Sequence, residues 1–91
     1  MNSLKIAEKI VGALVTIESF DPKNDMHVSV AWERMNEILN SEFEYIDIEH
    51  YLGARQGRYV KIIAYPEMRK EIKRYLDLFR AITGIEFGYI N

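Results

Sequence analysis

The feature that most constrains the fold is a pair of alternating segments, residues 43–51 and 58–65, separated by a short loop. Successive side chains of a β-strand point to opposite faces, so alternation predicts two half-buried strands joined as a hairpin. The apolar sets that would face the core are Ile46, Ile48 and His50 in the first segment, and Val60, Ile62 and Ala64 in the second.

Strand pairing must keep these two sets on one side of the sheet, which excludes registers shifted by one residue. Among the allowed registers, we favour the one that places Glu49 opposite Lys61, because opposite charges across strands stabilise the pair. The alternative register would place Asp47 opposite Lys61. The favoured register also aligns two tyrosine pairs, Tyr51 with Tyr59 and Tyr45 with Tyr65. In the loop, we expect Gly53 and Gly57 to supply positive φ angles.

A helix and a final strand are expected after the hairpin. Pro66 is suited to the first turn of a helix, and apolar residues recur at helical spacing from there to Ile82. Gly84 marks the end of that helix. Residues 85–90 read as a strand, which the intervening helix would place parallel to the second hairpin strand. Residues 43–90 therefore form a hairpin, helix and strand scaffold.

The N-terminal half allows two interpretations. Residues 1–20 favour a helix that is apolar over most of its surface, although 13–20 also have strand character. Residues 26–30 alternate as a strand does, and residues 31–40 are then predicted to form a helix. This interpretation gives a ferredoxin-like β-α-β-β-α-β order preceded by an N-terminal helix. The alternative is α-α-β-β-α-β, an α+β fold with two N-terminal helices on a three-stranded sheet.

The 91 residues are sufficient for one α+β domain, residues 1–91, with a modest core. The chain has no cysteine, and its longest apolar run, residues 10–17, is too short to cross a bilayer. We therefore expect a cytoplasmic protein with no membrane association. Charge is uneven, because residues 1–50 carry four Lys/Arg and ten Asp/Glu while residues 51–91 carry eight and four. Acidic and basic surfaces would then be available to meet between copies or with a partner.

The second face of the hairpin is unusually aromatic for a surface in water, and such a patch normally has something packed on it. Its members are Phe43 and the candidate interaction residues Tyr45, Tyr51, Tyr59, Ile63 and Tyr65. The N-terminal helix, a second copy or an external ligand would each cover it. We expect a non-enzymatic protein-interaction or regulatory module, such as an inhibitor, that forms a homo-oligomer, most simply a homodimer.

The alternative function is binding of single-stranded nucleic acid, by stacking of bases on tyrosines and neutralisation of phosphates. It would use the segment 55–61 and the basic face of the helix over 67–83, with candidate residues Arg55, Arg58, Lys61, Arg69, Lys73 and Arg74. Catalysis is not favoured, because His27 and His50 are the only imidazoles and no nucleophile has a recognisable setting. We expect His50 to be a partly buried, hydrogen-bonded core residue, and we expect no cofactor and no metal.

Overall fold

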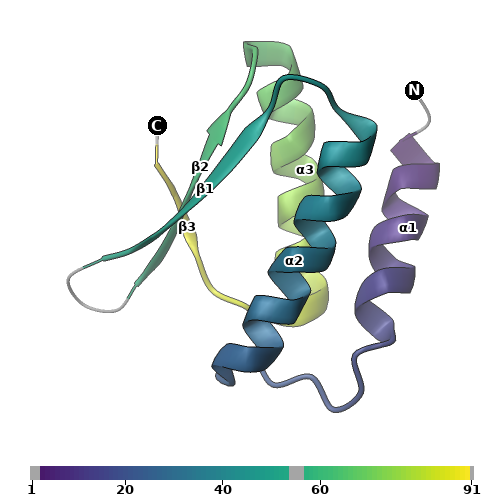
Figure 1. Cartoon of the computed structure of the whole chain (residues 1–91), viewed down its shortest axis with the longest axis vertical. Coiled ribbons are helices and arrows are strands. Elements are labelled where there is room, and N and C mark those ends of the chain that lie inside the picture. The colour runs from purple at the N-terminus through teal and green to yellow at the C-terminus, as the bar shows by residue number, and fades with distance from the viewer. Residues whose placement is uncertain (1–2, 54–56, 91) are drawn as a thin grey trace.

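The computed structural model describes residues 3–53 and 57–90. Its elements follow the order α-α-β-β-α-β, as Figure 1 shows. They are α1 (Ser3–Val15), α2 (Asp25–Glu42), β1 (Asp47–Leu52), β2 (Arg58–Ile63), α3 (Pro66–Thr83) and β3 (Gly88–Ile90). The fold is α+β, and its order confirms the alternative with two N-terminal helices on a three-stranded sheet. The ferredoxin-like order is not confirmed.

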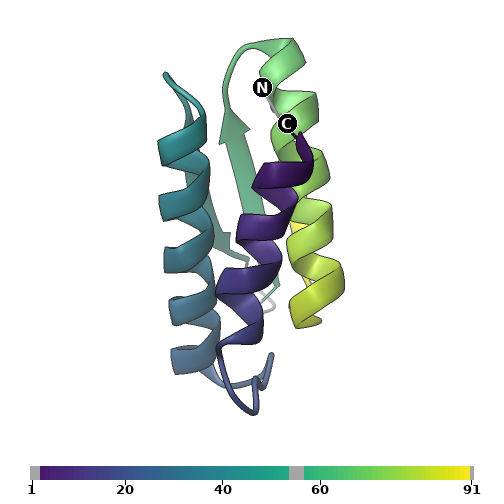
Figure 2. The same cartoon turned by 90° about the vertical axis from the view of Figure 1, so that its right-hand side faces the viewer.

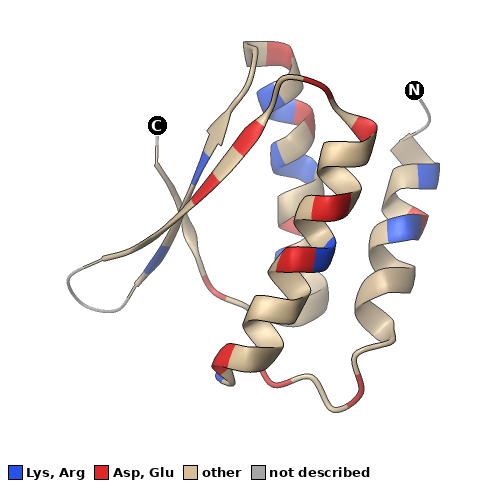
Figure 3. Cartoon of the chain, in the orientation of Figure 1, with Lys and Arg blue, Asp and Glu red and all other residues tan. Residues whose placement is uncertain are grey.

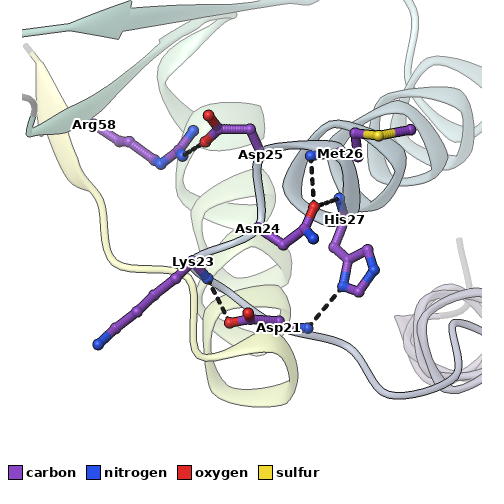
Figure 4. Close-up of polar contacts among 7 residues, drawn as sticks. All are labelled: Asp21, Lys23, Asn24, Asp25, Met26, His27 and Arg58. Atoms are coloured by element: carbon purple, nitrogen blue, oxygen red, sulfur yellow. Dashed lines mark hydrogen bonds and ion pairs between the residues drawn. The ribbon is translucent and has the colours of Figure 1, made fainter.

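The predicted strand over 26–30 is wrong, because these residues form the first turns of α2. Figure 4 shows why the helix begins there: the side chain of Asn24 caps it, accepting hydrogen bonds from the backbone N–H groups of Met26 at 3.0 Å and His27 at 3.2 Å. Apolar burial then follows the helical period. The buried residues of α2 are Val28, Ala31, Trp32, Met35 and Leu39, whereas Val30, which the strand would have buried, is exposed.

The hairpin forms in the predicted register. β1 and β2 are antiparallel, with Glu49 opposite Lys61 and Tyr51 opposite Tyr59. The ladder ends at the pair of Asp47 with Ile63, so the predicted pairing of Tyr45 with Tyr65 lies outside it. The strands are shorter than predicted at that end.

The helix after the hairpin also forms as predicted, with Pro66 in its first turn and Gly84 as its C-cap at φ 74°. The buried threonine at its end, Thr83, donates a hydrogen bond from its hydroxyl to the carbonyl of Phe79 at 2.8 Å. β3 then pairs parallel to β2. Of the predicted strand over 85–90, only Gly88–Ile90 is strand, and Ile85 and Phe87 in the segment before it are buried in the core.

The three helices lie on one side of the sheet. Figure 2 shows α1 in front of α2 and α3, with the sheet behind them, so α1 packs on the helices and not on the strands. Its buried stripe is Ile6, Ile10 and Leu14, while Leu4, Val11 and Val15 stay exposed. Of the three possible coverings of the second face of the hairpin, the N-terminal helix is therefore excluded.

The core between α2, α3 and the sheet is centred on aromatic contacts. The ring of Trp32 lies 4.4 Å from that of Phe79 and 5.3 Å from that of Phe87, measured between centroids. Phe43 is predicted on the outer aromatic face, but it is 3 % exposed and packs toward Tyr75. It follows the last residue of α2, so the helix carries it inward. Within the described part of the chain, no helix combines the length and apolar character needed to span a bilayer.

Candidate functional site

One face of the sheet is covered by none of the described residues, because all three helices pack on the other face (Figure 1). We call this surface the open sheet face. The strand register assigns to it Asp47, Glu49, Tyr51, Tyr59, Lys61, Ile63, Gly88 and Ile90. Its apolar members remain 38–44 % exposed: Tyr51, Tyr59, Ile63 and Ile90. Three of the five predicted interaction residues, Tyr51, Tyr59 and Ile63, are thus brought together on adjacent strands.

Tyr59 lies at the centre of this face on a bed of three glycines. A Cβ atom on Gly53 would come within 2.7 Å of its ring, and Cβ atoms on Gly57 and Gly88 within 3.3 and 3.4 Å. Of the two loop glycines, Gly53 does not have φ in the left-handed region, so the expectation of positive φ is wrong for Gly53. Their function is to leave space for the tyrosine ring. The loop closes with a hydrogen bond from the N–H of Gly53 to the carbonyl of Gly57 at 2.8 Å.

Polar groups of both signs accompany the rings. The hydroxyl of Tyr51 donates a hydrogen bond to Glu49 at 2.8 Å, which raises the pKa of Tyr51. Lys61 is the strand partner of Glu49. The open sheet face therefore carries carboxylates on β1 and an ammonium group on β2, side by side.

The other two predicted interaction residues are Tyr45, which precedes β1, and Tyr65, which follows β2. Both lie just beyond the pair of Asp47 with Ile63, where the ladder ends. Their side chains are 86 % and 70 % exposed. Each occupies a backbone position that suits another residue. Tyr45 has φ 60°, a region that non-glycine residues seldom adopt, and Tyr65 is the N-cap of α3 without a capping side-chain hydrogen bond.

A groove runs between α2 and the hairpin. Its volume is about 1120 Å³. We call it the α2 groove. The helix wall presents Val28, Ser29, Trp32, Glu33, Asn36, Glu37 and Asn40, and the hairpin contributes His50, Tyr51, Leu52, Arg58, Tyr59 and Val60. At one end Arg58 reaches across to Asp25 at the start of α2, at 3.1 Å (Figure 4).

The floor of this groove combines aromatic and polar groups. The imidazole of His50 meets the indole of Trp32 edge to face, with centroids 4.4 Å apart. Burial in this contact lowers the pKa of His50, and the charge of Asp47 opposes that effect only in part. His50 faces inward as predicted, but among the described residues it makes no hydrogen bond, and much of it is exposed. Asn36 also lines the groove, and its buried side-chain oxygen has no hydrogen-bond partner among the described residues.

The candidate nucleic-acid residues do not form one surface. Arg58 points to the helix side of the sheet and pairs with Asp25, whereas Lys61 belongs to the open sheet face. On α3, Arg69 donates to the carbonyl of Ala64 at 3.2 Å and Lys73 lies over the ring of Tyr89 at 5.0 Å. Arg74 is exposed on the same helix, and Arg55 lies outside the described residues. Figure 3 shows acidic residues along α2 and β1 and a group of basic residues on α3.

Among residues 3–53 and 57–90, no cluster of three or more His, Asp or Glu side chains is arranged to hold a metal ion. Comparisons with protein-family models, with curated proteins and with solved structures found no match.

Sequence reasoning missed the α2 groove. The signal was present, because Ser29, Glu33, Asn36, Glu37 and Asn40 recur at helical spacing and leave one face of α2 polar. The incorrect strand over 26–30 divided this stripe between two elements. The groove becomes visible only when α2 is one continuous helix.

Proposed function

We propose that this protein is a small non-enzymatic interaction module that self-associates through its open sheet face. The observation that carries the proposal is the group of four apolar side chains, Tyr51, Tyr59, Ile63 and Ile90, which remain more than a third exposed on three adjacent strands. Apolar surface of this kind gains free energy when a partner removes it from water.

Charge on the face favours a second copy as the partner. Glu49 and Lys61 lie opposite each other in neighbouring strands, so the face holds both signs close together. A two-fold dimer apposes one surface with itself, which allows Glu49 of each copy to approach Lys61 of the other. A face of a single sign would repel its own copy.

The exposed tyrosines at the edge support an interaction function. Tyr45 at positive φ and Tyr65 at an uncapped helix start both depart from local preference, and neither is compensated by burial of its side chain. Such departures concentrate at functional positions. Both flank the same end of the open sheet face and would extend its contact area.

The size of the face sets the expected affinity. β1 and β2, with six residues each, are about 20 Å long, and β3, with three residues, is about 10 Å long; at a spacing of about 4.8 Å they give a footprint of about 240 Å². Stable complexes bury about 800 Å² of each partner, so we expect a weak dimer with a dissociation constant in the micromolar range or above.

Sedimentation velocity over a concentration series tests the proposal. We expect the average mass of the native chain to rise with concentration, and Ile63→Asp to remain monomeric while its circular dichroism is unchanged. Val11→Asp is the matched control, because Val11 is 40 % exposed on α1 and Ile63 is 42 % exposed. Loss of association in Val11→Asp but not in Ile63→Asp would assign the interface to α1 and refute the proposal.

A further inference from the structure

The α2 groove is bordered by a free sheet edge. β1 pairs with β2 on one side only, and within the described residues nothing hydrogen-bonds to its other edge. Alternate residues of an antiparallel edge strand direct both N–H and C=O groups outward, which is a template for an added strand. Leu52, at the end of β1 and in the groove lining, is 75 % exposed.

The charge of the groove selects the chemistry of such a strand. Its lining holds the carboxylates of Asp25, Glu33 and Glu37 against one guanidinium, that of Arg58. Arg58 already pairs with Asp25. Glu33 and Glu37 form no ion pair with any residue in the described ranges. The helix wall therefore offers two carboxylates to a basic ligand, and phosphate would be repelled.

A third observation points to a hydrogen-bonding ligand. Asn36 lies between Glu33 and Glu37 on the groove side of α2, and within residues 3–53 and 57–90 its buried side-chain oxygen has no hydrogen-bond partner. A buried acceptor left without a hydrogen bond is destabilising, and such groups are rare in folded proteins. A donor carried by a ligand, together with a small rotation of the amide, would satisfy it.

We propose that the α2 groove binds an extended basic peptide, which adds to the edge of β1 as a fourth strand. Its main chain pairs with β1, as in other complexes that extend a sheet. The side chains that face α2 are Lys or Arg and meet Glu33 and Glu37. The intervening side chains are apolar and continue the open sheet face beyond Tyr51. The groove shares Tyr51 and Tyr59 with that face, but the contacts proposed for the peptide are the free edge of β1 and the carboxylates of α2, so the proposal does not require self-association.

The probe is a synthetic peptide of alternating Lys and Val, capped at both ends and long enough to span β1. Trp32 is the only tryptophan and lines the groove, so its fluorescence reports binding there. Two control peptides separate the contributions. An alternating Glu and Val peptide reverses the charge. The Lys and Val peptide with every backbone nitrogen methylated keeps the charge but cannot donate hydrogen bonds to β1 in either strand direction.

Two protein variants test the contacts. Glu33→Gln with Glu37→Gln keeps the shape of the helix wall and removes its charge, and we expect affinity for the Lys and Val peptide to fall roughly tenfold at low salt. The matched control, Glu8→Gln with Glu18→Gln, removes two exposed carboxylates outside the groove and should leave affinity unchanged.

The expected result is binding of the basic peptide alone, with slowed amide exchange along β1 and no binding of either control peptide. Equal binding of the acidic or N-methylated peptide would overturn the proposal. Absence of any Trp32 response at millimolar peptide would overturn it as well. A change in the mass of the free protein on Glu33→Gln with Glu37→Gln would assign the groove to a second copy, which also contradicts the peptide.

Discussion

The packing of Tyr59 on glycine gives the sharpest test of the site geometry. In Gly53→Ala, the new Cβ would lie 2.7 Å from the Cε2 atom of the Tyr59 ring, a distance that real contacts do not allow. The backbone at Gly53 is not in the left-handed region, so alanine introduces no φ strain there. The ring must therefore swing outward. Overpacking costs about 1–3 kcal/mol, and we expect about 1 kcal/mol because Tyr59 is 42 % exposed and can move into solvent.

A double-mutant cycle isolates this contact. Urea unfolding followed by circular dichroism gives the free energy of unfolding for Gly53→Ala, Tyr59→Ala and the double variant. We expect Gly53→Ala to lose most of its cost once the ring is absent, which is a coupling energy of about 1 kcal/mol. Gly88→Ala, whose Cβ would lie 3.4 Å from the ring, should cost less. An equal cost for Gly53→Ala in both backgrounds would refute the assigned function of the glycine.

Three further predictions concern stability. Gly84→Ala should destabilise the fold by about 1 kcal/mol, because Gly84 has φ 74°. Gly12→Ala should stabilise the fold by about 0.5–1 kcal/mol, because Gly12 lies in α1 with open space around it. Thermal unfolding of the two variants compares these effects. Burial lowers the pKa of His50 below 6.5, despite Asp47, so the folded state binds this proton less well than the unfolded state. Stability should fall as pH drops below 6.5, and His50→Gln should reduce that slope in urea titrations at several pH values. Tyr65→Ser should supply the missing N-cap of α3 and raise the free energy of unfolding by about 1 kcal/mol. No gain would show that the cap is already satisfied.

The C-terminal half could be predicted from sequence because each element carries several independent signals. The register of the hairpin follows from a period of two, from the pair of Glu49 with Lys61 and from the alignment of Tyr51 with Tyr59. The helix after it begins at a proline and ends at a glycine. These local constraints agree with one another, so few alternatives remained.

In the N-terminal half the helix α1 was predicted, but the choice between strand and helix for residues 26–30 could not be made because these residues satisfy both periods at once. Val28 is buried under either interpretation. A strand would bury Val30 beside it, whereas a helix buries Ala31, as the structure shows. The Asn24 cap and the tertiary packing of Trp32 decide for the helix. The site was predicted in part for the same reason: residues within the ladder were placed correctly, while Phe43 was drawn into the core by the helix that precedes it.

The most direct test of self-association through the open sheet face is an amide chemical-shift series on dilution of the native protein. We expect shifts that depend on concentration at Glu49, Tyr51, Lys61 and Ile63, with the exposed residues of α1 unchanged. Spectra that do not change between millimolar and low micromolar protein, or changes confined to α1, would contradict the account.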